Sequence, residues 1–321
     1  MIKVAVPHPE YLKQGVMQVP SMFIQTIREY ITNSCPDMEL LDVGDDQEEM
    51  VKNLRSGMVP DALVAIAASG VYAQTTQFFR RHKTKVFLFW DDLHWYENKV
   101  LKARHRIFSE SQVLLLPYHN NFVRIPQFKA YHHKSRLFPW FAPMECFNYH
   151  PSWEDRKNKI LLSGAFNKTV YPLRHNIFNF GKNNTEIETL KHPGYTHRGG
   201  KRNHEIIGSA YYSYMRDFKG SVGTSGTPYS CGIKTPYPIC KFFEIPGCGC
   251  TPFFDEILDL EELGFIPYTH YIPIHKGNLQ TALKLTEKSK SIAKNALQFI
   301  LQHHSALIRA EQLCNIIREE L

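Results

Sequence analysis

Short, continuously apolar runs separated by helical patterns are the feature that most constrains how this chain can fold. Six strands are predicted in the first half, at residues 3–7, 38–43, 62–67, 85–90, 113–116 and 136–138, and two of them, 62–67 and 113–116, are apolar throughout. Between them, helical spacing recurs over residues 21–33, 47–54, 71–81, 94–108 and 121–132. Apolar runs without alternation are typical of strands buried on both faces, and their alternation with helices predicts parallel pairing through right-handed crossovers. The first half is therefore predicted to be a Rossmann-like, doubly wound α/β domain.

A proline-rich stretch followed by a charge run marks the domain boundary. Pro139, Pro143 and Pro151 precede the charged segment 154–159, after which the alternation restarts. Strands are predicted at 159–162, 186–192, 220–223 and 251–254, and helices at 172–180, 211–217 and 240–245. The tail 278–321 is helical by pattern, with a break near 302–305 where Ser305 is a candidate N-cap. We predict two Rossmann-like domains, 1–143 and 144–302, that face a cleft, and a C-terminal helix over 303–321.

The amino-acid composition is that of a globular chain and argues against a disordered or a membrane-spanning protein. The 321 residues are 43% hydrophobic and 21% charged, with a formal net charge of +7, which excludes a disordered polymer. No apolar stretch approaches the ~20 residues of a membrane-spanning helix, and no signal-peptide pattern precedes the first strand, so a cytoplasmic address is expected. The segment 198–202 and the pair Arg80 and Arg81 are basic, which suggests nucleic-acid binding. However, the cations are dispersed and no known motif accompanies them, so no nucleic-acid partner is predicted.

The seven cysteines are an odd, scattered set and form no disulfide framework. Cys248 and Cys250, with Cys231 and Cys240 upstream, suggest a zinc cluster, but a C-x-C pair lacks the two-residue spacer of usual zinc knuckles. Buried, reduced thiols are the better interpretation, and no metal site is predicted.

The ends of the predicted strands supply the candidate functional residues, because ligands of open parallel sheets bind at the carboxyl ends of strands. In the N-terminal half this rule selects His8, Asp91, Asp92 and His94, together with Glu10, Ser69, Gly70 and His119. In the C-terminal half it selects Ser163 and Gly164, then His192, Gly194 and Tyr195, then residues 223–226, and finally the segment around Glu244.

The loop that follows the strand 159–162 has the composition of a phosphate site. Gly164 permits close backbone approach, a helix that begins at Pro172 directs free N–H groups toward it, and Lys168 or Arg174 can neutralise phosphate. A diphosphate would fit there. The alternative is an ordinary strand-to-helix loop with two surface cations.

Glu244 is a lone carboxylate within an apolar run, immediately before a Gly-x-Gly turn and another strand. A buried, unpaired carboxylate is costly, so a cation or hydroxyl partner is expected. A ribose diol would satisfy both oxygens. The alternative is a structural salt bridge to Lys241 or Lys234.

The C-terminal half resembles that of GT-B glycosyltransferases, particularly the CgeB-like, spore-maturation type within the group 1-like families. The resemblance covers about residues 159–313. It rests on the K-x-F-E-I-P-x-C-G pattern at 241–249, on residues 171–174 after Gly164, on residues 192–195, and on the helical stretch 295–313. Two features depart from the wider pattern. Tyr237 stands where many members have a glutamate, seven residues before Glu244, and the basic insertion 194–203 has no counterpart.

The resemblance implies transfer of a hexosyl or deoxyhexosyl group from a nucleoside-diphosphate sugar to a hydroxyl of a glycan or glycoconjugate. Glu244 would bind the ribose and Arg174 or Lys168 the diphosphate. The full set of implied donor contacts is Gly164, Lys168, Arg174, His192, Gly194, Tyr195, Lys241 and Glu244. Cations and helix N-termini meet the leaving-group charge in this fold, so no obligatory metal is expected.

The catalytic base is expected in the N-terminal half if the reaction inverts configuration, because such a base must reach the acceptor hydroxyl. Asp92, Asp91, His94 and His8 are the candidates, although Asp91 and Asp92 could equally cap the helix that begins near His94. A retaining enzyme would not need this base.

Other functions predict different sequence features or behaviour. A non-catalytic nucleotide or sugar-phosphate binding protein on the same fold would bind nucleotide without turnover. A dehydrogenase is disfavoured because no G-x-G-x-x-G follows residues 3–7.

Overall fold

The computed structural model describes residues 1–6, 18–44, 47–66, 79–90, 105–117, 119–193, 204, 206–226 and 236–321. The described residues fold into two compact units. Unit 1 comprises those up to Pro139 together with Ala306–Leu321, and unit 2 comprises those from Trp140 to Ser305. None of the described helices is long and apolar enough to cross a membrane.

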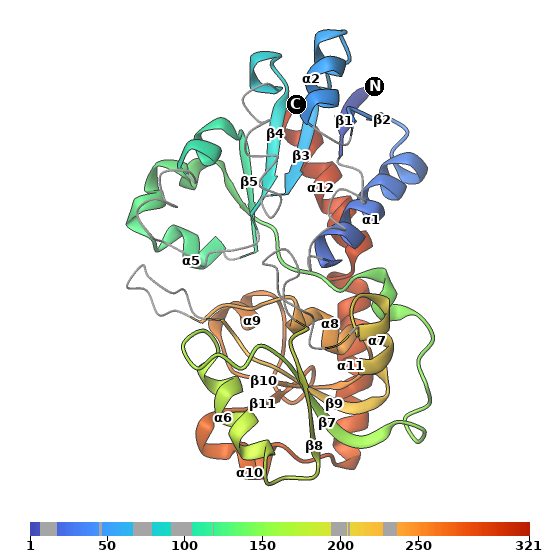
Figure 1. Cartoon of the computed structure of the whole chain (residues 1–321), viewed down its shortest axis with the longest axis vertical. Helices are drawn as coiled ribbons and strands as arrows, with labels where there is room; N and C mark the ends of the chain where they lie inside the picture. Colours follow the sequence, from blue (N-terminus) through green and yellow to red (C-terminus); the bar gives the residue numbers. More distant parts are fainter. Residues whose placement is uncertain are drawn as a thin grey trace. The chain divides into compact units, whose positions relative to one another are not determined.

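Unit 1 contains a parallel sheet of six strands in the order β2-β1-β3-β4-β5-β6 (Figure 1). The strands are β1 (Ile2–Ala5), β2 (Met38–Leu41), β3 (Ala62–Ile66), β4 (Lys85–Phe89), β5 (Val113–Leu116) and β6 (Ser135–Leu137). Val113–Leu116 is buried along its whole length, as expected for a strand covered on both faces. The predicted parallel α/β architecture is confirmed.

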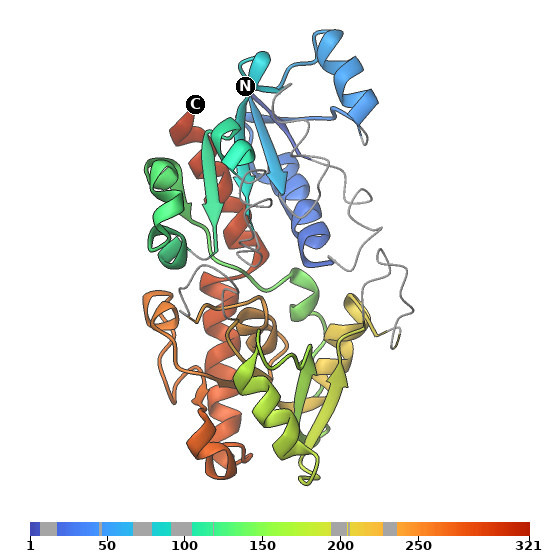
Figure 2. The same ribbon diagram turned by 60° about the vertical axis from the view of Figure 1, so that its left-hand side comes forward.

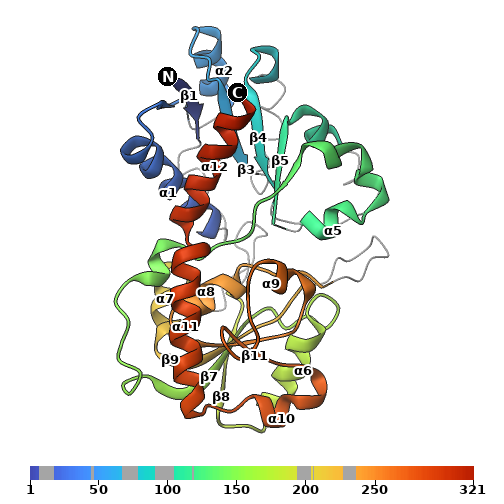
Figure 3. The same cartoon turned by 180° about the vertical axis from the view of Figure 1, so that it is seen from behind.

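The helices of unit 1 include one from the far end of the chain. They are α1 (Gln18–Ser34), α2 (Gln47–Arg55), α5 (His119–Val123), the 3-10 helix η2 (Pro126–Lys134) and α12 (Ala306–Glu320). Helix α12 lies beside α1 (Figures 2 and 3). Arg318 of α12 forms an ion pair with Asp37, with two nitrogen–oxygen distances of 2.8 Å. The last fifteen residues before Leu321 thus belong to the N-terminal sheet domain.

Unit 2 contains a second parallel sheet, with strand order β11-β10-β9-β7-β8. Its strands are β7 (Lys157–Gly164), β8 (Ile187–Lys191), β9 (Phe218–Gly223), β10 (Thr251–Phe254) and β11 (Ile272–Pro273). Its helices are η3 (Met144–Phe147), α6 (Pro172–Gly181), α7 (Ser209–Arg216), α8 (Lys241–Gly247), α9 (Leu258–Glu262), η5 (Lys276–Asn278), α10 (Leu279–Ala282) and α11 (Glu287–His303). Helix α11 contacts β10 and α8, and runs along the side of the sheet that faces the viewer in Figure 3.

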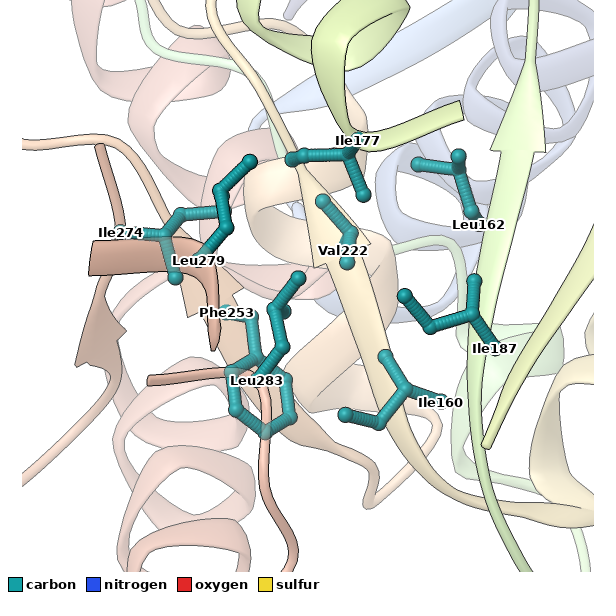
Figure 4. Close-up of a cluster of buried hydrophobic side chains, with 9 residues drawn as sticks. All are labelled: Ile160, Leu162, Ile177, Ile187, Val222, Phe253, Ile274, Leu279 and Leu283. Carbon is teal, nitrogen blue, oxygen red and sulfur yellow. The ribbon is translucent and has the colours of Figure 1, made fainter. Parts of the chain in front are cut away.

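The core of unit 2 joins the sheet to α6 and α10 (Figure 4). Its members are apolar side chains that are at most 7% exposed: Ile160, Leu162, Ile177, Ile187, Val222, Phe253, Ile274, Leu279 and Leu283. Residues 160 and 162 alternate along β7, which is why they share one face of the sheet. This packing fixes the end of β7, where the candidate site begins.

Two helical predictions were wrong, each for a local reason. The expected helix over 121–132 is interrupted, because α5 ends at Val123 and Ile125 is extended before Pro126, which starts a 3-10 helix. The tail is not helical from 283 to 286, since Thr286 caps a new helix through a capping box with Ser289. The predicted break near 302–305 is confirmed between α11 and α12.

Candidate functional site

The carboxyl ends of four adjacent strands in unit 2 lie along one edge of the sheet. Strands β10, β9, β7 and β8 are neighbours and all parallel, so Asp255, Thr224, Gly164 and His192 stand at the same edge. His192 N donates to Gly164 O at 2.9 Å, which ties the ends of β8 and β7 together. Ligands of open parallel sheets bind at this edge.

Gly164 has a backbone conformation that favours glycine, and two basic side chains pack closely against it. Its φ is +112°, in the region that L side chains rarely adopt. A β-carbon here would lie 3.0 Å from Arg174 Nη1 and 3.3 Å from Lys241 Cε. The glycine therefore makes room for two basic side chains, Arg174 and Lys241, which we call the cationic pair.

Arg174 is held at this edge by neutral oxygen atoms. Its Nε donates to Thr224 Oγ1 at 3.1 Å, Nη2 to Thr224 O at 3.2 Å and Nη1 to Ala165 O at 3.3 Å. The guanidinium stacks on the ring of Tyr171 at 4.0 Å. Arg174 is only 2% exposed, and burial lowers its pKa. None of the described carboxylates is bonded to Arg174, although the charge of Asp255 opposes the effect of burial on its pKa. A buried cation of this kind favours an anionic ligand.

Lys241, in the first turn of α8, is held by two hydroxyl groups. Its Nζ donates to Ser163 Oγ at 2.9 Å and to the hydroxyl of Tyr211. Burial lowers the pKa of Lys241; Glu244 opposes this shift and Arg174 adds to it. The coupling to Arg174 and the shared contact with Gly164 place the two cations close together.

Glu244 lies one turn after Lys241 and is 3% exposed. Its Oε1 accepts a hydrogen bond from the Tyr212 hydroxyl at 3.1 Å. Burial raises the pKa of Glu244, while Lys241, Tyr212 and the thiol of Cys240 oppose the shift. Glu244 takes part in none of the ion pairs between described residues, so the alternative of a salt bridge to Lys241 is not what the structure has. Lys234 lies outside the described residues.

His192 experiences the positive charge of this edge. Burial, together with Lys241, His204 and Arg174, lowers its pKa to about 4. The imidazole is therefore neutral at neutral pH, and the positive charge of this part of the edge comes from Arg174 and Lys241.

Three polar residues of this edge were not selected from the sequence. Tyr211 and Tyr212 lie on α7, where their spacing shows only a partly apolar helix. Asp255 follows β10 directly, so the rule applied to the other strands would have found it. It accepts from Ser225 N at 2.9 and 3.1 Å, and burial raises its pKa.

The remaining predicted residues are not part of this cluster or cannot be placed. Lys168 is exposed in a turn that Asn167 caps by accepting from Thr169 N at 2.8 Å. Tyr237 is buried and pairs through its backbone with Gly226, in two hydrogen bonds of 3.2 Å. His119 lies in unit 1, where its Nε2 is 3.2 Å from Ser135 Oγ. The others lie outside the described residues: His8, Glu10, Ser69, Gly70, Asp91, Asp92, His94, Gly194 and Tyr195, as does the basic segment 198–202.

The described cysteines are free thiols, and all but Cys240 are buried. Burial raises the pKa of Cys146 and of Cys250. Within the described ranges, no three or more His, Cys, Asp or Glu side chains gather as a metal site would require.

Together these residues offer two adjacent cations and a buried carboxylate at the ligand-binding edge of a parallel sheet. The cations can bind phosphate oxygens, and the carboxylate can accept hydrogen bonds from hydroxyl groups. This arrangement suits a ligand that carries phosphate and sugar hydroxyls within one molecule.

Comparison with known proteins finds similar structures but no similar sequences. No family model matches the sequence, and no curated protein matches it significantly. Among solved structures, sucrose-phosphate synthase from Thermosynechococcus elongatus superposes with a TM-score of 0.60 at 11% identity, over 99% of this chain and 98% of that chain. The chain has the GT-B fold.

Two further GT-B structures match over nearly their full length. Anabaena HepE, in complex with UDP and glucose, gives a TM-score of 0.59 at 11% identity, over 99% of this chain and 100% of that chain. An alpha-glucosyltransferase in complex with UDP and a 13-mer DNA gives 0.57 at 10% identity, over 99% of each chain. At these identities the likeness is one of fold.

Proposed function

We propose that this GT-B chain is a glycosyltransferase that moves a hexosyl or deoxyhexosyl group from a nucleoside-diphosphate sugar to a hydroxyl of a glycan or glycoconjugate. The observation that carries the proposal is the meeting of Arg174 and Lys241 at Gly164. Because both cations are held by neutral groups, they remain available to the negative charge of a diphosphate. The UDP complexes of HepE and of the alpha-glucosyltransferase support this choice of ligand.

Each residue of the edge has a proposed role. Arg174 and Lys241 bind the diphosphate, with Lys168 as a further cation on the exposed turn. Glu244 accepts the ribose hydroxyls, and the segment with His192, Gly194 and Tyr195 contacts the base. The cationic pair stabilises the nucleoside diphosphate as the glycosidic bond breaks, so the proposed chemistry does not require a metal ion.

The general base belongs to the N-terminal unit in this proposal. Asp92, which follows β4 in the sequence, is the first candidate, before Asp91, His94 and His8. It would remove the proton from the acceptor hydroxyl as that oxygen attacks the anomeric carbon.

The test is nucleoside-diphosphate release from a panel of UDP, GDP, ADP and dTDP sugars, with and without a mixture of glycan acceptors. We expect one nucleotide series to be consumed, and Arg174→Gln to abolish consumption. Binding of a nucleotide sugar without any release would instead favour a non-catalytic binding protein. The absence of both binding and release would contradict the proposal.

A further inference from the structure

Lys241 is part of a closed triangle of hydrogen bonds. Its Nζ donates to Ser163 Oγ at 2.9 Å and to the Tyr211 hydroxyl, and the oxygens of Ser163 and Tyr211 are 2.7 Å apart. The ammonium also lies 4.7 Å from the centroid of the Tyr211 ring. The three residues come from β7, α7 and α8, so the triangle connects two helices to the end of the strand that carries Gly164.

The triangle fixes the lysine without neutralising it. Burial raises the pKa of Tyr211 well above its usual value, so its phenol stays neutral, and Ser163 carries no charge. An ammonium has three N–H donors, and the triangle uses two, so one N–H of Lys241 has no bond to a described residue and can serve a ligand. A lysine without these contacts would have to give up the freedom of its four-carbon chain when a ligand binds.

Fixing Lys241 matters because of its neighbour. Arg174 Nη1 and Lys241 Cε both lie within 3.3 Å of the position a β-carbon would take at Gly164. Two like charges repel, and a flexible lysine would move its ammonium away from the guanidinium. The hydroxyls of Ser163 and Tyr211 oppose that movement, because they bond the ammonium from the strand and from α7.

We propose that Tyr211 and Ser163 are positioning residues that hold Lys241 beside Arg174, so that the two cations together select a diphosphate over a monophosphate. The inference rests on the proposed function, because it concerns the same donor site. A diphosphate has two phosphoryl groups to share between the two cations, whereas a monophosphate has one. Loss of either hydroxyl should therefore weaken the binding of a diphosphate more than the binding of a monophosphate.

The experiment is calorimetric titration of the full chain with UDP, UMP and inorganic pyrophosphate. Tyr211→Phe and Ser163→Ala each remove one hydroxyl of the triangle. The matched control is Tyr214→Phe, which removes a hydroxyl from the same helix, where it donates to Glu188 at 3.0 Å. We expect UDP and pyrophosphate affinity to fall about tenfold in each triangle variant, with UMP affinity changed much less. Tyr214→Phe should keep the wild-type ratio of UDP to UMP affinity.

The outcomes separate this inference from the proposed function. Equal losses of affinity for UDP and UMP in both triangle variants would indicate a general loosening of the site and would overturn the positioning role. Unchanged UDP affinity in these variants would also overturn it. If Tyr211→Phe fails to fold, Ser163→Ala alone decides by the same ratio. The wild type could instead bind pyrophosphate but not UDP. If the triangle variants then bind pyrophosphate more weakly, the positioning role is supported and a uridine donor is contradicted. Failure of wild type to bind any of the three would overturn the positioning role, whereas the proposed function is overturned only if the nucleotide-sugar panel also shows neither binding nor release.

Discussion

Arg174 and Lys241 approach the same point of the backbone from two different helices, α6 and α8. A β-carbon at Gly164 would lie 3.0 Å from the Nη1 atom of the arginine and 3.3 Å from the Cε atom of the lysine. Gly164, at the end of β7, has a positive φ and no β-carbon, which leaves space for two side chains that are far apart in the sequence. The proposed donor site depends on this glycine.

Substitution of Gly164 tests that dependence. Gly164→Ala should lower the free energy of unfolding by about 1–3 kcal/mol through backbone strain, and should also shift the cationic pair and weaken UDP binding. Gly57→Ala is the matched control, because Gly57 has a φ of +93° and nothing within 4 Å of the added carbon. We expect it to lose stability by strain alone, with full UDP affinity. Thermal unfolding and UDP titration measure the two effects, and normal UDP binding by Gly164→Ala would count against the site.

Glu244→Gln tests the ribose role without leaving the Tyr212 hydroxyl unpaired, as an alanine would. Loss of the charged acceptor should weaken UDP binding by about 1–3 kcal/mol. Glu188→Gln is the control, because Glu188 also accepts from a tyrosine of α7, at 3.0 Å, yet lies near the amino end of β8 and not at the carboxyl end where the site is. Equal UDP affinity for wild type and Glu244→Gln in calorimetry would refute the role.

The pH dependence of stability should also change in Glu244→Gln. Burial raises the pKa of Glu244 from 4.5, so above pH 4.5 the folded state holds this proton more tightly than the unfolded state. The free energy of unfolding of the wild type therefore falls as the pH rises through the raised pKa, and glutamine removes this term. Compared with wild type, the variant should be relatively more stable at pH 8 than at pH 5. Urea unfolding at both values measures this, and a constant difference would contradict it.

Asp92→Asn tests the proposed base. Turnover should fall by about 100-fold or more while UDP affinity is retained, because general-base catalysis typically contributes that much. Asp91→Asn tests the second candidate in the same assay, and a loss of turnover in that variant with full turnover in Asp92→Asn would assign the base to Asp91. Undiminished turnover in Asp92→Asn would remove this residue from the candidates.

The parallel sheets were predictable because their strands are buried on both faces. Residues 113–116 are four consecutive aliphatic residues, and the strand has those same bounds. Strand β11 was not predictable in this way, since it is only two residues long and ends in Pro273. The assignment of α12 to unit 1 was equally hidden, because an apolar stripe on a helix does not say which domain covers it.

The candidate site was predictable where a strand end could be located. Gly164 follows a clear apolar run, and Glu244 is conspicuous as a carboxylate within an apolar segment. The contacts that hold the site were not predictable, because Ser163, Tyr211 and Lys241 meet only through tertiary packing. The lowered pKa of His192 was not predictable for the same reason, because the charges of Lys241 and Arg174 that contribute to it come from other helices.

Calorimetric titration of UDP into wild type and Lys241→Met tests the central claim most directly. Methionine keeps much of the side-chain length and removes the charge. The control is Lys219→Met, because Lys219 lies on β9 with its Nζ 5.8 Å from the centroid of the Trp153 ring. Our account predicts saturable UDP binding by wild type and the control, and affinity at least about tenfold lower for Lys241→Met. Equal UDP affinity in all three proteins, or wild type that binds none of UDP, GDP, ADP and dTDP, would contradict it.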